Sequence, residues 1–196
     1  MSTRVTLVLI NGHAGVGKDT FVTFCKEYAE LEGNTKVYNI HRSDYPKIAL
    51  QTLGWDGEKD EETRVLLKHM VDYMELKGLL DEYLKDQILV STRVNPRTDN
   101  VIIFYHVRDP EVMYNLLDEY LENQFARPIS VLIQRDLNKN NEPNEWWGDL
   151  ENADYCMTVK LPNNSFDDMR ELAKEFVDFL LNEDWKIQKG GHTWSL

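Results

Sequence analysis

Cysteine, basic residues and long apolar runs are all scarce in this chain. The 196 residues include only 2 cysteines, Cys25 and Cys156, which lack the paired spacing of a zinc site, so we expect reduced thiols. No stretch approaches the roughly 20 apolar residues of a membrane span. Residues 1–10 contain one charge and no small-residue cleavage site. We therefore expect a cytoplasmic protein that does not bind membranes.

Acidic residues outnumber basic ones. The 22 Lys and Arg against 34 Asp and Glu leave a net charge of -12, which repels polyanions unless the basic residues gather at one site. Nucleic-acid polymers are therefore not expected as partners. Length and a hydrophobic content of 42% suit one domain, with at most an insertion. The oligomeric state is left open, a homodimer included.

Short β-prone runs alternate with helical patterns, which predicts an α/β fold. We expect five strands, over residues 5–10, 36–40, 101–106, 129–134 and 155–159. The first is continuously apolar, as in a central parallel strand. A crossover helix is expected to begin at Pro110. A closing helix is expected behind Ser165, with Asp168 completing a capping box, and to end near Asn182, leaving residues 183–196 as a tail.

About 60 residues separate the second and third strands, too many for a simple crossover. The interval has a helical pattern from about residue 61 to 90, and Gly78 divides two apolar sets that we expect to form core. These are Val65, Leu66, Met70, Val71 and Met74, then Leu79, Leu80, Tyr83, Leu84 and Ile88. A helical insert over about 43–95 and a polar candidate lid over about 135–149 complete a predicted single domain of residues 1–182.

A glycine-rich motif follows the first strand at once. Its spacing fits the phosphate-binding pattern of Gly, four residues, Gly and Lys, but it has Asp where Ser or Thr is usual. Glycines let the backbone turn tightly and aim N–H groups at phosphate oxygens, with a helix N-terminus behind them. An ordinary glycine turn is the alternative. We predict nucleotide binding by Gly12, His13, Ala14, Gly15, Val16, Gly17, Lys18, Asp19 and Thr20.

Asp19 changes the expected metal chemistry. A Ser or Thr hydroxyl normally gives magnesium a neutral oxygen at this position, whereas a carboxylate adds charge beside the phosphates. We predict that Asp19 holds the ion directly or through water, with Thr20, one residue later, as the second candidate ligand. Capping of the helix N-terminus is the alternative for Asp19, and the two roles are compatible.

The sequence from Gly17 to Thr20, Gly-Lys-Asp-Thr, resembles bacteriophage deoxynucleoside monophosphate kinases and, more distantly, animal phosphomevalonate kinases. The resemblance covers roughly residues 4–182 in element order, and only the loop motif is specific. It implies a P-loop NTPase-type three-layer α/β/α fold with a five-stranded parallel sheet in the order 2-3-1-4-5. It also implies ATP and Mg2+ as cofactors, small-molecule nucleotides as partners, and a phage or prophage source active in the host cytoplasm.

In those families a segment ending in a lysine and then basic helices hold the phosphate acceptor. The matching residues here are Ser43, Lys47, Arg64 and Lys68. Arg64 and Lys68 lie four residues apart on an expected helix, so they share one face and suit one acceptor phosphate. A solvated helix face is the alternative, with Glu61 and Asp72 as surface partners.

The third strand of these families often closes with Asp-Val-Arg, and here the sequence from His106 to Arg108 is His-Val-Arg, with Glu111 following. We predict that Arg108 contacts phosphate as well as acceptor, because the carboxyl end of a central strand borders the ligand crevice. A surface role is the alternative. His106 has two interpretations. Either it replaces an acidic residue near the metal, in which case Asp19 or Asp109 takes the role of that acid, or it is a packed strand-end histidine.

The candidate lid is poor in arginine for a nucleotide kinase, since only Arg135 and Lys139 are available. Arg135 is predicted to stabilise the transferring phosphoryl, with Arg127 as a weak reserve and helix-end pairing as the alternative. Trp146 and Trp147 either cover adenine or pack beneath the loop.

Taken together, these residues predict magnesium-dependent transfer of the γ-phosphoryl of ATP to a small phosphorylated acceptor, with Lys18, Arg108 and Arg135 as catalytic residues. A deoxynucleoside monophosphate is the favoured acceptor. A kinase for another metabolite such as phosphomevalonate stays open. So does a nucleotide-binding regulator with weak catalysis, because of Asp19, His106 and the arginine-poor lid.

Overall fold

A computed structural model describes residues 3–31, 33–58, 60–94, 98–123, 126–135, 155–163, 165–182 and 192–194. The chain divides into two compact units, which we describe separately. The sheet unit comprises Met1–Asn39 and Arg97–Leu196, and the insert unit comprises Ile40–Pro96.

The sheet contains the strands β1 (Arg4–Asn11), β2 (Thr35–His41), β3 (Asn100–His106), β4 (Arg127–Gln134), β5 (Met157–Lys160) and β6 (His192–Trp194). Their order is β2-β3-β1-β4-β5-β6. The first five strands are parallel and follow the predicted order 2-3-1-4-5, so the predicted fold class is confirmed. β5 begins two residues later than predicted. β6 lies inside the predicted tail and pairs in parallel with β5. The sequence did not predict this strand, because three residues are too few to form a recognisable periodic pattern.

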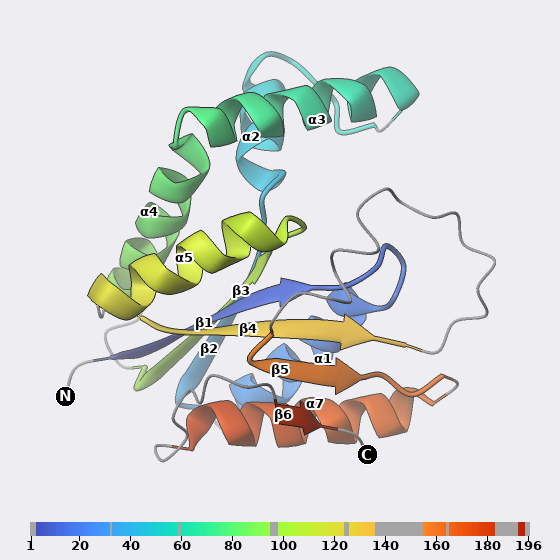
Figure 1. Ribbon diagram of the computed structural model, residues 1–196, viewed down its shortest axis with the longest axis vertical. Helices are drawn as coiled ribbons and strands as arrows, with labels where there is room; N and C mark the ends of the chain where they lie inside the picture. The colour runs from blue at the N-terminus through green and yellow to red at the C-terminus, as the bar shows by residue number, and fades with distance from the viewer. Residues whose placement is uncertain are drawn as a thin grey trace. The chain divides into compact units, whose positions relative to one another are not determined.

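Helices cover both faces of the sheet (Figure 1). Helices α1 (Lys18–Leu31) and α7 (Phe166–Leu181) pack against each other on one face, and α5 (Pro110–Asn123) covers the other face. Successive side chains of β1 point to opposite faces of the sheet. Val8 and Ile10 belong to the core beneath α1 and α7. Because both faces are covered, residues from the second position of β1 onward are all buried, as its continuous apolar run predicted.

Helix α7 begins at the predicted cap. The Ser165 hydroxyl accepts a hydrogen bond from the Asp168 backbone N–H at 3.0 Å, which satisfies one of the donors left over at a helix start. The helix then buries a full apolar stripe, including Met169, Leu172 and Phe176, against the sheet. The Phe176 ring lies 5.5 Å from that of Phe21 in α1, centroid to centroid. Cap and stripe together explain why this segment is a helix.

Replacement of this cap gives a direct test of its contribution. We expect Ser165→Ala to lower the free energy of unfolding by about 1 kcal/mol, because the Asp168 N–H loses its acceptor. Ser165→Asp keeps an acceptor oxygen and serves as the control, with stability expected close to that of the parent chain. Urea unfolding followed by circular dichroism measures both variants. Equal losses in the two would contradict a role for the cap.

The insert unit is helical. It consists of α2 (Asp44–Thr52), α3 (Glu61–Leu76) and α4 (Leu79–Val94), and α3 packs against both of the others. The Tyr45 ring of α2 stacks on the Tyr83 ring of α4, with centroids 5.0 Å apart and planes 6° from parallel. Gly78 separates α3 from α4 with a φ of +70°, a conformation that favours glycine, so the predicted division at this residue is confirmed.

The predicted core of the insert is partly wrong. After Gly78 the expected residues Leu80, Leu84 and Ile88 are buried. Before it, Val65 and Leu66 are each 47% exposed, and the buried residue of α3 is Leu67. Adjacent helical residues point about 100° apart, and the buried direction of α3 passes through Leu67, so Val65 and Leu66 lie outside its contact face.

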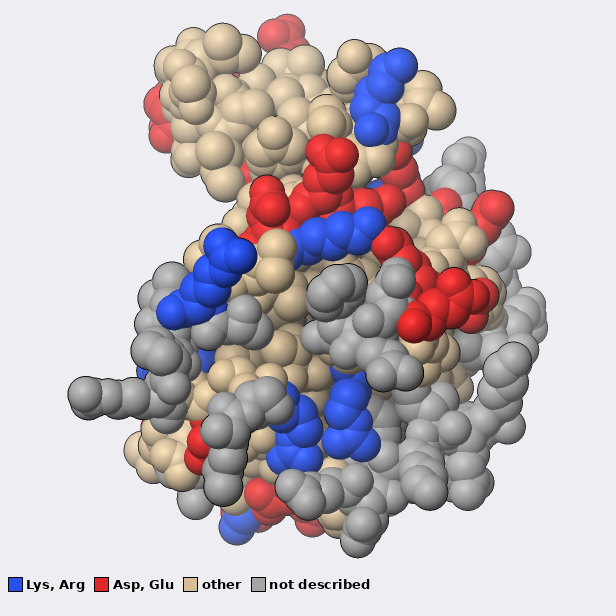
Figure 2. Space-filling view, turned by 90° about the vertical axis from the view of Figure 1, so that its left-hand side faces the viewer, with Lys and Arg blue, Asp and Glu red and all other residues tan. Residues whose placement is uncertain are grey.

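Other expectations from composition concern thiols, membranes and surface charge. Cys25 and Cys156 are both free; Cys25 is buried, and burial raises the pKa of its thiol. Among the described residues, no helix combines the length and apolar composition needed to cross a membrane. On the face drawn in Figure 2, described Lys and Arg side chains lie in several separate places and do not form one continuous basic patch. The expected absence of nucleic-acid partners stays a prediction.

Candidate nucleotide-binding site

The glycine-rich motif joins the carboxyl end of β1 to the start of α1, in the middle of the sheet. In this strand order the chain leaves β1 toward β2 and leaves β4 toward β5, so connections from two adjacent strands run in opposite directions. Parallel sheets bind ligands in the crevice outside the carboxyl ends of such strands. The motif therefore occupies the position where this architecture favours ligand binding.

Three glycines of the loop adopt conformations that other residues rarely take. Gly12, Gly15 and Gly17 have φ values of +141°, +73° and +104°. At Gly12 a Cβ atom would lie 2.4 Å from the Ile133 carbonyl oxygen of β4, so the neighbouring backbone excludes any side chain. At Gly17 it would lie 3.3 Å from Leu161 Cδ1. The loop thus needs glycine for both conformation and space.

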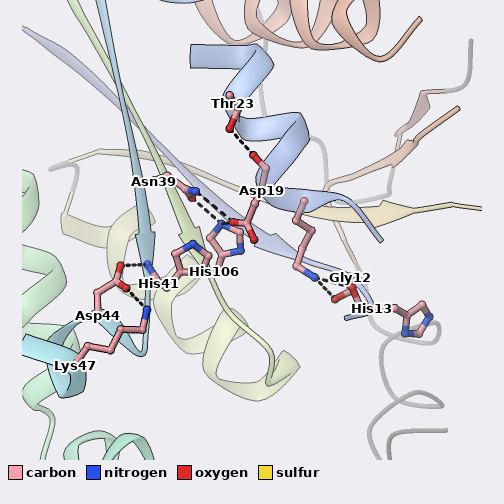
Figure 3. A network of polar contacts seen from close by, with 10 residues as sticks. Gly12, His13, Asp19, Thr23, Asn39, His41, Asp44, Lys47 and His106 are labelled. Atoms are coloured by element: carbon pink, nitrogen blue, oxygen red, sulfur yellow. Dashed lines mark hydrogen bonds and ion pairs between the residues drawn. The ribbon is translucent and has the colours of Figure 1, made fainter. Parts of the chain in front are cut away.

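Lys18 folds back over this loop. Its ammonium donates hydrogen bonds to the carbonyl oxygens of Gly12 at 2.6 Å and His13 at 2.8 Å (Figure 3). Burial, reinforced by the Arg108 guanidinium, lowers the pKa of Lys18 from 10.5 to about 8, while Asp19 acts in the opposite sense. An anion placed beside Lys18 would offset both unfavourable effects.

Arg108 is coupled to the loop through a residue that sequence reasoning missed. Asn11, the buried last residue of β1, accepts from the Gly12 N–H at 2.7 Å and donates from Nδ2 to the Arg108 carbonyl oxygen at 3.2 Å. One amide thereby holds both the start of the loop and the backbone behind Arg108. The available signal was a polar residue ending an otherwise apolar strand.

Arg135 is a third cation beside the loop. It follows β4 directly, and its Nη2 donates to the Asn163 carbonyl oxygen at 2.8 Å. Its Nη1 lies 3.8 Å from the position that a Cβ of Gly17 would take. Arg127, the weaker alternative, begins β4 opposite Thr6 and so lies near the amino end of that strand, away from the loop. Lys139, Trp146 and Trp147 lie outside the described residues.

Three polar side chains meet at the start of α1. Asp19 Oδ1 lies 3.6 Å from His106 Nε2 and 3.4 Å from Asn39 Nδ2, and His106 Nε2 lies 2.7 Å from Asn39 Oδ1 (Figure 3). His106 is buried at the end of β3, whereas the Asp19 side chain is 68% exposed. His106 is therefore a packed strand-end histidine that also faces the loop carboxylate. Sequence reasoning missed Asn39, which the end of β2 supplies.

The donor atoms at the end of the loop suit a divalent ion. Asp19 lies inside the first turn of α1, two residues past the capping position, and offers an exposed carboxylate, while the next residue, Thr20, offers a hydroxyl. Oxygen donors of this kind are what Mg2+ prefers. Asp109 Oδ1 accepts from the Glu111 N–H at 2.8 Å at the start of α5, and the role of Asp109 as an alternative to Asp19 stays a prediction.

The predicted acceptor residues of the insert unit have local partners or lie exposed. Ser43 precedes α2 without a side-chain cap bond, and Lys47 Nζ lies 2.7 Å from Asp44 Oδ1. On α3, Arg64 is 66% exposed and lies 4.0 Å from Glu61, and Lys68 is exposed. The solvated-face alternative anticipates this Arg64 pair, and the acceptor role stays a prediction.

Comparisons with known proteins bear on the fold. No protein-family model matches the chain, and no curated protein matches it in sequence. A tunicamycin resistance protein from Deinococcus radiodurans superimposes with a TM-score of 0.50 at 13% identity, over 91% of this chain and 96% of that one. The likeness shows a shared fold.

Two other solved structures are less similar. The Mycobacterium tuberculosis APS kinase CysC, in complex with AMPPNP and APS, gives a TM-score of 0.49 at 13% identity, covering 92% of this chain and 99% of that one. Thymidylate kinase from Ehrlichia chaffeensis gives 0.43 at 15% identity, covering 90% and 99%.

Proposed function

We propose that this protein is a P-loop phosphotransferase that moves the γ-phosphoryl of ATP to a small phosphorylated acceptor, a deoxynucleoside monophosphate in the first instance. The observation that carries the proposal is the loop of Gly12, Gly15 and Gly17, with Lys18 folded over it at the switch point of the sheet. Backbone N–H groups, the N-terminus of α1 and a lysine ammonium form a phosphate site when they converge in this way.

The surrounding charges support transfer as well as binding. Arg108 and Arg135 lie on loops at the carboxyl ends of β3 and β4, which flank β1, so positive charge borders the loop on both sides. Preorganised cations stabilise the negative charge that spreads over a transferring phosphoryl group. Asp19 and Thr20 would hold a divalent ion, which when bound neutralises further phosphate charge. The Lys18 ammonium would stay in contact with the phosphoryl group as it moves from donor to acceptor.

The acceptor class rests on the resemblance of the loop sequence Gly-Lys-Asp-Thr and on the basic side chains of the insert unit. Arg64 and Lys68, one helical turn apart on α3, suit the phosphate of a monophosphate acceptor. Lys47 would give a further contact once an acceptor anion competes with Asp44. A kinase of another small phosphorylated metabolite would use the same donor loop with a different acceptor.

The test is ADP formation from Mg-ATP with each of the four deoxynucleoside monophosphates, their ribonucleotide counterparts and phosphomevalonate. We expect one deoxynucleoside monophosphate to stimulate ADP formation and to be recovered as the diphosphate. Stimulation by phosphomevalonate alone would name a different acceptor. If ATP raises the melting temperature but no acceptor stimulates turnover, the protein is a nucleotide-binding regulator instead.

The lowered pKa of Lys18 predicts proton uptake when nucleotide binds. Near pH 8 about half of the Lys18 side chains are neutral in the free protein, and phosphate anions favour the charged form, so binding should take up about half a proton per nucleotide there. Nucleotide affinity should accordingly fall as the pH rises through about 8. Calorimetric titration with ADP in two buffers of different ionisation enthalpy measures the uptake. Lys18→Met is the control, and equal uptake in that variant would contradict the assignment to Lys18.

A further inference from the structure

The strongest unexplained feature of the described residues is the meeting of Asp19, Asn39 and His106. Three different elements contribute to it: the first turn of α1 and the carboxyl ends of β2 and β3. Each side chain offers a metal-ligating atom, namely a carboxylate oxygen, an amide oxygen and an imidazole nitrogen. The proposed transfer reaction needs an oxygen-bound ion beside the phosphates, and it gives no role to the imidazole.

The spacing of these atoms suits ligands of one ion. Two ligands at right angles, each about 2.1 Å from a divalent ion, lie about 3 Å apart. His106 Nε2 is 2.7 Å from Asn39 Oδ1 and 3.6 Å from Asp19 Oδ1, so the two distances lie on either side of that separation. Without an ion, the His106 Nε2–H donates to Asn39 Oδ1. Metal binding requires the tautomer with its proton on Nδ1, whose Nε2 lone pair faces both oxygens, and the short contact to Asn39 then joins two ligands of one ion.

The chemistry of the set selects the class of ion. Mg2+ prefers oxygen ligands throughout, whereas first-row transition ions accept imidazole more readily, Mn2+ the least and Ni2+, Cu2+ and Zn2+ more strongly. The site lies at the start of the helix that follows the phosphate loop, where phosphate oxygens of a bound nucleotide would complete the coordination. His106 is largely buried and Asn39 fixes its ring nitrogen, so the imidazole is already oriented.

We propose that Asp19, Asn39 and His106 form a binding site for a divalent transition ion, and that bound nucleotide strengthens this site. The part played by the phosphates rests on the proposed function, whereas the three protein ligands do not. Mg2+ would still bind through Asp19 and Thr20, but a transition ion would gain the His106 nitrogen. The ratio of transition-ion affinity to Mg2+ affinity would therefore be larger at this site than for the free nucleotide.

Mn2+ is the probe for this site, because its electron spin resonance measures the concentration of free ion and also detects a nitrogen atom bound directly to the ion. Mn2+ is titrated onto the full chain with and without ADP, and Mg2+ is titrated by calorimetry. We expect spin-echo modulation from one directly bound nitrogen in the parent chain. His106→Gln should abolish that modulation and weaken Mn2+ binding by about tenfold or more, with Mg2+ affinity within about twofold of the parent. His69→Gln, an exposed histidine of α3, is the matched control and should change neither.

Circular dichroism and thermal melting show whether His106→Gln folds. A second variant keeps the test decisive if it does not. Asn39 is exposed, and Asn39→Asp replaces its amide oxygen with a charged one, so Mn2+ binding should become tighter. Absence of nitrogen modulation in the parent chain, or unchanged Mn2+ affinity in a folded His106→Gln protein, would overturn the proposal. So would an unchanged or weaker Mn2+ affinity in Asn39→Asp.

These outcomes are separable from a failure of the proposed function. Binding of ADP without metal tests the phosphate loop alone. If ADP does not bind, the transferase proposal fails, and the titration with Mn2+ alone still decides the ligand set. If transfer proceeds with Mg2+ while no nitrogen binds Mn2+, only the transition-ion site is refuted.

Discussion

Lys18→Ala is expected to lower phosphoryl transfer by about 1,000-fold or more while the fold survives. The ammonium is the cation folded over the phosphate loop, and its two hydrogen bonds end on carbonyl oxygens of that loop rather than on distant elements. Removing the ammonium takes a positive charge away from the site of the transferring phosphoryl, but it removes no core packing. The measurement is the rate of ADP formation at saturating acceptor, with thermal melting as the check on folding.

The matched control for this variant is Lys26→Ala. Lys26 is an exposed lysine of the same helix, two turns further along, so the two variants lose the same charge from α1. Activity within about twofold of the parent is expected for Lys26→Ala, since surface charges contribute little. Retained transfer in a folded Lys18→Ala protein would remove the basis for the transferase proposal.

Gly12→Ala is expected to destabilise the protein by about 3 kcal/mol or more, because two penalties add. A φ of +141° is rarely tolerated by residues with a Cβ, and that atom would lie 2.4 Å from the Ile133 carbonyl oxygen. The obstacle is strand backbone in the middle of the sheet, which cannot rotate away as a side chain can. Guanidinium unfolding monitored by fluorescence measures the loss.

Gly15→Ala separates the two penalties. Gly15 also has a positive φ, of +73°, but a Cβ there meets nothing within 4 Å among the described residues. Its expected cost is about 1 kcal/mol, from backbone conformation alone. Similar losses for the two variants would show that the close approach of β4 to Gly12 contributes little. A larger loss for Gly12→Ala supports the requirement for glycine at the base of the loop.

Sequence patterns predicted the elements where local physics decides. The apolar run of β1, the glycine and lysine spacing of the loop and the Ser165 cap each act over a few residues, and the structure contains all three. The pattern of α3 was a weaker guide. It marked Val65 and Leu66 as core, and the choice of Leu67 instead depends on which side of the helix meets its neighbours.

The sequence by itself determined the α/β alternation, the phosphate loop and the identity of its lysine, because these depend on neighbours along the chain. Only the tertiary structure placed Asn39 and His106 beside Asp19, since these residues belong to segments far apart in sequence. The sheet order brings them together: β3 lies between β2 and β1, and parallel strands present their carboxyl ends at one edge. The same order sets Arg108 and Arg135 on the two sides of the loop, because their strands flank β1.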